Sequence, residues 1–152
     1  MITPYIRPIK HEELEALIDL YQHLHSDDAP LPDRGTLTNL WHNILANPML
    51  HYLAAEVDAQ LVSSCTLAII PNLTRGARPY GVIENVVTHV DFRQQGLGRA
   101  MLNHALEIAW DENCYKVMLM TGSKRETTFR FYEGAGFNRQ EKTAFIAKPR
   151  HK

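Results

Sequence analysis

A short run of residues with two glycines, Arg93-Gln94-Gln95-Gly96-Leu97-Gly98, constrains the fold of this chain more than any other feature. It lies between residues 82–88, a strand-like run rich in β-branched residues, and a helix-like run that starts at Gly98. The helix-like run carries one apolar stripe, formed by Leu97, Met101, Leu102, Ala105, Leu106 and Ala109. A strand that turns through glycines into a helix leaves backbone N–H groups unpaired at the helix N-terminus. We therefore expect an anion site that binds a phosphate-bearing ligand, because glycines let a phosphate come close to the backbone.

The residues around the glycines argue against two common phosphate-binding motifs. A P-loop ends in Gly-Lys-Ser/Thr, whereas Arg99, Ala100 and Met101 follow Gly98 here. A dinucleotide-binding fingerprint has a third glycine where this chain has Met101, and the next strand-like run, 116–121, ends without the acidic residue that would hold a ribose. On these residues alone, a plain strand-to-helix turn and a phosphate site both stay open.

A second motif follows the loop motif in register. It reads Phe131-Tyr132-Glu133-Gly134-Ala135-Gly136-Phe137 and comes after the helix and strand that succeed the loop. Together the two motifs resemble those of the GNAT superfamily of acyl-CoA-dependent N-acetyltransferases, strongly over residues 80–137 and more loosely over the whole chain. Within that superfamily, residues 83–87 and 114–117 look like the corresponding runs of the glucosamine-phosphate N-acetyltransferases. The resemblance implies transfer of an acetyl group from acetyl-CoA to the primary amine of a small molecule.

Hydrophobic periodicity and turn residues predict the other elements. We expect strands over residues 3–9, 50–57, 61–70, 82–88, 116–121 and 142–147, and helices over 11–24, 36–47, 98–113 and 125–133. This order predicts an α+β (mixed α/β) protein with one parallel, right-handed crossover. The resemblance implies the GNAT acyltransferase fold, whose central mixed, mostly antiparallel sheet has about 6–7 strands flanked by about 4 helices.

Composition limits the classes of partner. At 152 residues we expect a single domain spanning 1–152, and a net charge of −1 gives no reason to expect nucleic acid. The two cysteines, Cys65 and Cys114, and the scattered histidines suggest neither a disulfide framework nor a metal site. No apolar run approaches the ~18 residues of a membrane span. We expect a cytoplasmic protein without a metal or a membrane partner.

Coenzyme A has to be held before acetyl transfer can occur. We expect its pyrophosphate arm to meet the loop amides of Arg93, Gln94, Gln95, Gly96, Leu97, Gly98 and Arg99. Its pantetheine arm carries two amides that can pair with a strand edge, which the resemblance assigns to Val86, Val87 and Thr88. One of these backbone N–H groups would also stabilise the oxyanion of the thioester.

Two residues are candidates for proton transfer. Glu84 interrupts an apolar strand, and we expect partial burial to raise its pKa so that it serves as the general base. The alternative is a structural glutamate bonded to a neighbouring turn. The resemblance assigns Tyr132 as the general acid for the coenzyme A thiolate, and the alternative is a core tyrosine of the helix.

One departure from the family pattern concerns the start of the last helix. Many members carry an Asn seven residues before the motif tyrosine and an Ala three residues after that Asn, where this chain has Arg125 and Thr128. Arg125, with Lys124 and Arg99, could reach the outer phosphates of coenzyme A. A solvated basic patch is the alternative.

The sequence leaves the acceptor and the partners open. Arg75 and Arg78 favour an anionic acceptor, whereas the aspartates of the loop between the first two helices favour a cationic one; these are Asp27, Asp28 and Asp33. The alternative function is a GNAT-fold module that binds acyl-CoA without turnover. The apolar end of the last predicted strand, Phe145-Ile146-Ala147, leads us to expect a homodimer.

Overall fold

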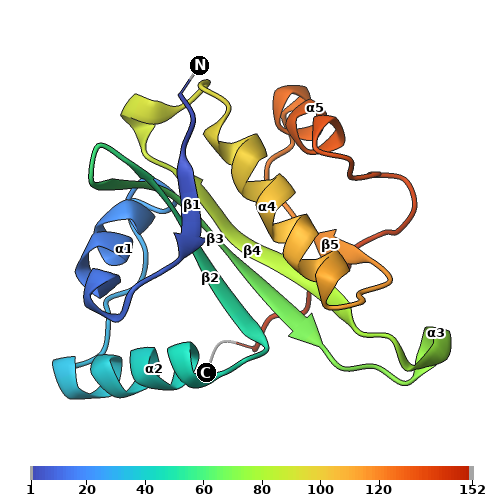
Figure 1. The fold of residues 1–152 in the computed structure, drawn as a ribbon, viewed down its shortest axis with the longest axis horizontal. Helices are drawn as coiled ribbons and strands as arrows, with labels where there is room; N and C mark the ends of the chain where they lie inside the picture. Colours follow the sequence, from blue (N-terminus) through green and yellow to red (C-terminus); the bar gives the residue numbers. More distant parts are fainter. Residues whose placement is uncertain (1, 151–152) are drawn as a thin grey trace. The chain divides into compact units, whose positions relative to one another are not determined.

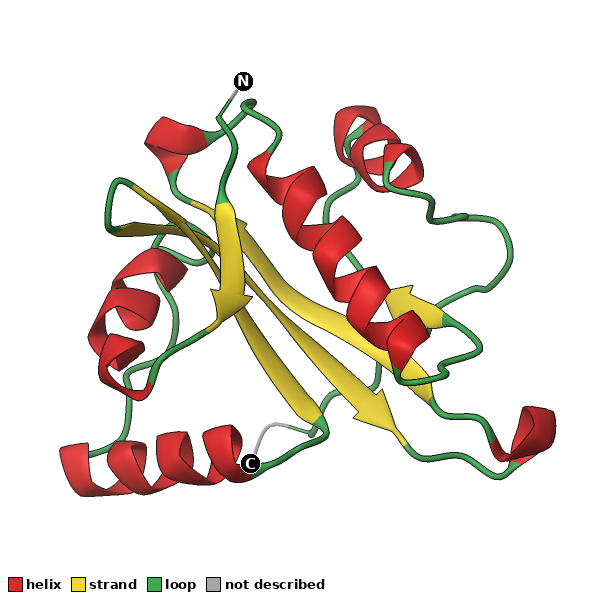
Figure 2. Ribbon diagram, in the orientation of Figure 1, coloured by secondary structure: helices red, strands yellow, loops and turns green. Residues whose placement is uncertain are grey.

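The computed structural model describes residues 2–150, and the chain forms two compact units, Met1–Leu119 and Met120–Lys152. In the first unit the elements are β1 (Tyr5–Pro8), η1 (His11–Glu13), α1 (Leu14–Tyr21), α2 (Arg34–Ala46), β2 (Leu50–Val57), β3 (Gln60–Ile70), α3 (Thr74–Ala77), β4 (Tyr80–Thr88), η2 (Val90–Phe92), α4 (Leu97–Asp111) and β5 (Val117–Leu119), as Figures 1 and 2 show. The second unit contains α5 (Glu126–Gly134).

The sheet of the first unit has five strands in the order β1-β2-β3-β4-β5. Neighbouring strands are antiparallel except β4 and β5, which are parallel and are connected through α4. The predicted α+β class and the predicted parallel crossover are therefore confirmed. The sheet was expected to have about 6–7 strands, and five are present among the described residues.

The strand predicted over residues 142–147 is wrong, because the described chain has no strand there. Phe145 is 91% exposed and Ile146 is 73% exposed. An apolar, β-branched composition favours a strand only where a neighbouring strand supplies ladder hydrogen bonds. The described residues 120–150 provide no such neighbour.

Helices bury both faces of the central strands. On one face, Leu17 of α1 and Trp41 of α2 form a core cluster with Ile9 and Ala54, and Tyr21, Tyr52 and other half-buried residues pack against it. Helix α4 contacts β2, β3 and β4 on the other face (Figure 1). Its buried residues are Leu97, Met101, Leu102, Ala105 and Ala109, which is the predicted stripe except for half-buried Leu106.

The N-cap of α2 is Asp33, three residues before the predicted start of this helix at residue 36. The Asp33 carboxylate accepts hydrogen bonds from the Thr36 backbone N–H at 3.0 Å and from the Thr36 hydroxyl at 2.7 Å. An aspartate cap satisfies one of the free N–H groups of the first turn, so α2 begins at Arg34. The carboxylate of Asp33 therefore stabilises the N-terminus of α2.

A buried arginine connects β1, β2 and η1. Arg7 is 8% exposed and pairs with Glu13 at 2.7 Å and with Glu56 at 2.7 Å. The hydrogen bonds from Arg7 lower the pKa of the Glu13 carboxyl, although its partial burial opposes this. The pairing compensates the charge that the fold buries at this edge of the sheet.

Candidate active site

An extra residue interrupts β4 in the middle of the strand. Glu84 lies opposite Thr66 of β3 and Val87 lies opposite Ser64, so β4 advances by three residues where β3 advances by two. Asn85 accommodates the extra residue in the left-handed region, with a φ of 53°. Asparagine is one of the few non-glycine residues that adopt this conformation readily. The result is a β-bulge, which changes the direction of the backbone groups beyond it.

Two backbone hydrogen bonds show this change. Before the bulge, the Gly81 N–H donates to the Lys116 carbonyl, just before β5, at 3.0 Å. After the bulge, the His89 N–H donates to the Val62 carbonyl of β3, at 2.8 Å. Because successive peptide groups of a strand alternate in direction, the odd-numbered residues of this strand face β5 before Asn85 and β3 after it.

The backbone groups of Val86 and Thr88 consequently point away from β3. The ladder between β4 and β5 ends at Ile83, so within the described residues no strand pairs with this edge of β4 farther along. An open edge of this kind accepts an extended ligand that carries amides. The side chain of Val87 is buried, at 3% exposure, while that of Val86 is half-buried.

The N-terminus of α4 lies a few residues beyond this edge. Its N-cap is Gly96, with a φ of 83°, and no side chain caps the helix. The first turn contains no acidic residue. The first backbone N–H groups of α4 therefore have no partner within the helix and lie at the positive end of its dipole. These features suit an anion such as a phosphate.

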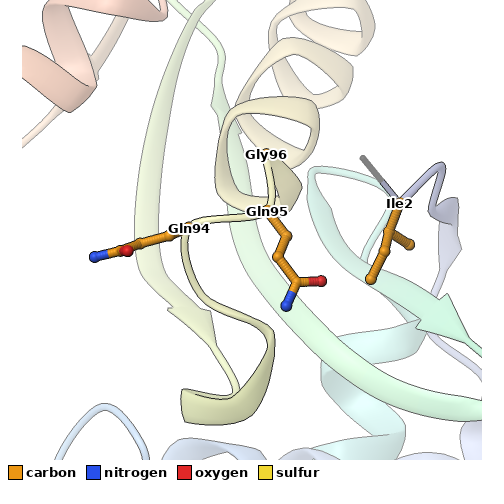
Figure 3. A pocket seen from close by; sticks show the side chains of 4 residues that line it. All are labelled: Ile2, Gln94, Gln95 and Gly96. Carbon is orange, nitrogen blue, oxygen red and sulfur yellow. The ribbon is translucent and has the colours of Figure 1, made fainter.

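The loop before α4 borders an open hollow of about 480 Å³. Its lining consists of Ile2, Gln94, Gln95 and Gly96, and Figure 3 shows the two glutamine side chains leaving the loop in different directions. Gln94 has a φ of 60°, which is uncommon for a residue with a side chain. The loop thus presents its backbone, rather than a covering of side chains, beside the helix N-terminus.

The Arg93 side chain forms hydrogen bonds that connect this loop to two other segments of the chain. Its guanidinium donates to the Thr88 carbonyl at 3.2 Å and to the His23 carbonyl at 2.9 Å. The charged group is thereby engaged with the end of β4 and with the segment after α1. Sequence reasoning proposed Arg93 only as a loop residue of the phosphate site and did not foresee this anchoring, because the contact with His23 is distant in sequence.

Glu84 projects from β4 immediately before the bulge, and its side chain is exposed. The predicted partial burial of this carboxylate is therefore wrong. Neighbouring apolar residues suggested burial, but the buried neighbour Ile83 belongs to the opposite face of the strand. Among the described residues, Glu84 takes part in no side-chain hydrogen bond or ion pair, so its carboxylate is available to a ligand.

In the second unit, Tyr132 lies on α5 and is half-buried. Its ring is 5.0 Å from that of Phe131 and 6.4 Å from that of Phe137, centroid to centroid. Burial raises the pKa of the Tyr132 phenol, which therefore keeps its proton into alkaline solution. A protonated phenol is what a proton donor requires.

The start of α5 contains the two residues that depart from the family pattern. Thr128 is engaged, because its hydroxyl lies 3.0 Å from that of Ser123. Arg125 is the N-cap residue, and its side chain is exposed, like those of Lys124 and Arg99. Exposure is compatible with both the phosphate-binding and the solvated-patch interpretations.

In the sequence, arginines and aspartates gave opposite indications of the charge of the acceptor. Two of these residues, Arg78 and Asp33, form hydrogen bonds within the protein. Arg78 donates to the carbonyls of Asn113 and Cys114 at 3.3 Å, where α4 leads into β5. Asp33 caps α2. Neither residue therefore indicates the charge of an acceptor. Within residues 2–150, no helix is long and apolar enough to cross a membrane.

Comparison with known proteins agrees with this geometry. The sequence profile of the "Acetyltransferase (GNAT) family" matches residues 14–137. A glucosamine 6-phosphate N-acetyltransferase of Trypanosoma brucei brucei is 31% identical over 138 residues, which are 90% of this chain and 90% of that protein. Among solved structures, a protein assigned as an acetyltransferase from Agrobacterium tumefaciens str. C58 has a TM-score of 0.88 and 41% identity, covering 95% of this chain and 99% of that one. Glucosamine-6-phosphate N-acetyltransferase from Arabidopsis thaliana shares the fold, with a TM-score of 0.83 at 20% identity, covering 97% of this chain and 99% of that one.

Proposed function

The chain belongs to the GNAT family of acetyltransferases and is an acetyl-CoA-dependent N-acetyltransferase. We propose that it holds acetyl-CoA along the edge of β4 and the N-terminus of α4, and that it transfers the acetyl group to the primary amine of a small molecule. The observation that carries this proposal is the open edge of β4 beyond Ile83, followed by the uncapped N-terminus of α4. The edge offers backbone groups of Val86 and Thr88 to the pantetheine amides. The helix offers free N–H groups to the pyrophosphate.

Glu84 and Tyr132 are the proposed proton carriers. Glu84 accepts the proton of the ammonium group, directly or through water, and the neutral amine attacks the thioester carbonyl. A backbone N–H of the β4 edge stabilises the oxyanion. The C–S bond then breaks, Tyr132 protonates the departing thiolate, and the nitrogen loses its second proton to give the amide. That proton passes through water to the Tyr132 phenolate, and Glu84 releases its own proton to solvent. The raised pKa of Tyr132 supports its role as a donor, and the exposed Glu84 carboxylate is accessible to the ammonium group.

An amino sugar phosphate is the first acceptor class to test. The support is the 31% identity with the trypanosomal glucosamine 6-phosphate N-acetyltransferase over most of both chains. A panel of amines, with thiol release as the readout, should contain glucosamine 6-phosphate, unphosphorylated amino sugars, polyamines, amino acids and aminoglycosides. We expect turnover with a primary amine, and a panel without any turnover would contradict the proposal.

Calorimetry tests the cofactor independently of the acceptor. Acetyl-CoA should bind, and ATP and NAD should not, because the loop lacks the side chains of the nucleotide-binding motifs. Binding of ATP or NAD without binding of coenzyme A would overturn the reading of the loop. Binding of acetyl-CoA with no acetylated amine would instead favour a module that holds the thioester without turnover.

A further inference from the structure

Two histidines hold the turn that precedes the phosphate loop. This turn, η2, leads from the end of β4 into the loop of residues 93–99. The His89 side chain caps η2, because its Nδ1 accepts a hydrogen bond from the Asp91 backbone N–H at 3.1 Å. The Nδ1 of His23, which follows α1, accepts from the Val90 backbone N–H at 3.4 Å. Two consecutive backbone N–H groups of η2 therefore donate to imidazole nitrogens.

The two imidazole rings also contact each other. Their centroids lie 4.1 Å apart, and the ring planes are inclined by 41°. The ring of Phe92 meets His89 edge-on, with 5.6 Å between the centroids. The His23 carbonyl accepts from the Arg93 guanidinium at 2.9 Å. His23 therefore holds η2 through its ring and the first residue of the phosphate loop through its carbonyl.

These hydrogen bonds require neutral imidazoles. An imidazole nitrogen accepts a hydrogen bond only while it carries no proton, so each ring keeps its single proton on Nε2. A second proton has to go to Nδ1, which then becomes a donor that faces a backbone N–H, and the hydrogen bond is lost. Two protonated rings in contact would also repel each other. Imidazole is the side-chain group whose charge changes between about pH 5 and pH 8.

The surroundings allow the rings to take up protons. Both histidines line a hollow of about 390 Å³, so solvent protons can reach them. Asp19 of α1 lines the same hollow, and the Asp91 carboxylate lies 3.9 Å from the Nδ1 of His89. These carboxylates favour protonation of the rings, whereas the guanidinium of Arg93 at the His23 carbonyl opposes it. The turn between β2 and β3 contributes only uncharged residues to the hollow, which are Ala59, Gln60 and Leu61.

We propose that His23 and His89 are positioning residues, which hold η2 and the phosphate loop in the arrangement that binds coenzyme A only while both imidazoles are neutral. This proposal rests on the proposed function and adds a pH-dependent control to its cofactor site. In acidic solution the rings release the N–H groups of Val90 and Asp91. The backbone that leads into the loop then loosens, and coenzyme A binds more weakly. Binding of coenzyme A is therefore coupled to the release of protons from the two rings.

The variant that carries both His23→Asn and His89→Asn tests the proposal. The Oδ1 of asparagine lies the same number of bonds from the backbone as the Nδ1 of histidine, and it accepts hydrogen bonds without titrating. The variant should bind coenzyme A like the wild type at about pH 8. From there to about pH 5.5, the wild type should lose about 10-fold more affinity than the variant. A phosphate monoester of coenzyme A also ionises near pH 6, but it does so in both proteins, so the difference between them isolates the histidines.

Two further variants complete the comparison. His23→Ala combined with His89→Ala removes both acceptors, so its affinity for coenzyme A should be about 10-fold below that of the wild type at about pH 8. His42→Asn changes an exposed histidine of α2 and should keep the pH dependence of the wild type. Calorimetry in two buffers near pH 6 supplies a second measurement. Binding of coenzyme A should release more protons from the wild type than from the alanine variant.

The outcomes separate this inference from the proposed function. Equal losses of affinity in the wild type and the asparagine variant overturn the role of the histidines and leave the acetyltransferase intact. If the asparagine variant binds weakly at every pH, the proton release decides, and equal release from the wild type and the alanine variant overturns the proposal. Absence of coenzyme A binding to the wild type at any pH removes the proposed cofactor site and this inference together.

Discussion

Gly35 and Gly98 occupy the same place in two helices, because each is the second residue of its helix, α2 or α4. The two N-termini differ in their caps. The Asp33 carboxylate closes the N-terminus of α2, whereas no side chain closes that of α4. This pair therefore allows the anion site to be tested with one substitution made in two positions.

Gly98→Asp should abolish coenzyme A binding and leave the fold largely intact. The new side chain fills the space of the pyrophosphate, and its carboxylate repels it. Gly35→Asp is the control, since it also puts an acidic side chain in the first turn of a helix but should preserve binding. Calorimetry with coenzyme A measures both, and near wild-type affinity in Gly98→Asp would show that the loop has been misread.

Glu84→Gln should lower the rate by a factor of about 10²–10⁴ and erase the acidic limb of the pH profile, with acetyl-CoA affinity nearly unchanged. The reason is that glutamine can still form hydrogen bonds but cannot accept the ammonium proton. Glu107→Gln, an exposed position on α4, controls for loss of charge. Steady-state rates from pH 5 to about pH 10 give the comparison. An acidic limb that persists in Glu84→Gln assigns the base to another group.

Tyr132→Phe should lower the rate about 10²-fold at neutral pH and less at high pH. A thiolate can leave without a proton donor in alkaline solution. The difference in rate between the wild type and Tyr132→Phe should therefore become smaller at high pH. Burial raises the pKa of the Tyr132 phenol, so the wild type should retain its donor over the same range. Tyr5→Phe, at a 66% exposed position, is the control. A defect that is constant with pH would indicate a packing role.

Arg7→Met should lower the free energy of unfolding by about 2 kcal/mol, because Glu13 and Glu56 lose the buried arginine that pairs with them. The pKa of the Glu13 carboxyl is lowered in the folded protein, so this stabilisation is complete above its unfolded pKa and is lost as the pH falls through the folded one. The difference in Tm between the wild type and Arg7→Met should therefore become smaller as the pH is lowered from neutral to about pH 3.

Arg34→Met is the control for that experiment. Arg34 pairs with Glu15, but their side chains are 68% and 60% exposed, so the pair should contribute close to nothing. Equal losses of Tm in the two variants would contradict the importance of burial for Arg7.

The exposed side chains of Phe145 and Ile146 lead us to predict a homodimer at micromolar concentration, because two adjacent apolar residues form a patch that a partner can bury, unlike a single exposed apolar residue. Phe145→Asp should give a monomer in light scattering. Leu73→Asp removes an equally exposed apolar residue, also 91% exposed, and should leave the dimer unchanged. A wild-type mass corresponding to one chain would remove the prediction.

Sequence reasoning identified the elements whose signals are local. The apolar stripe of α4 and the glycines before it follow directly from spacing, and the hairpin of β2 and β3 follows from two apolar runs around a turn. The strand over residues 142–147 could not be excluded in this way, because a strand depends on a neighbour that composition does not reveal.

The chemistry of the site was harder to read because it depends on the bulge. The exposure of Glu84 and the pairing of Glu84 with Thr66 require the register of β3 against β4. The one available signal was Asn85, a residue type that tolerates the left-handed region, standing between a glutamate and two valines. Such an asparagine in an otherwise regular strand pattern is a reason to expect a bulge.

The extra residue at Asn85 also determines which changes in the length of β4 the fold can accept. Ile83 and Val87 are both buried and are four residues apart, yet they lie opposite Leu67 and Ser64, which belong to different faces of β3. Removing the extra residue would leave a regular ladder in which Glu84 still lies opposite Thr66 and Val87 still lies opposite Ser64. Inserting a further residue after the bulge would instead exchange the two faces for the rest of the strand, so that Val87 would leave its core and the backbone of Val86 would turn back to β3. Selection can therefore vary the side chains along this strand and can remove the bulge, whereas an insertion beyond the bulge would disrupt the packing of Val87 and the open edge of β4 in a single step.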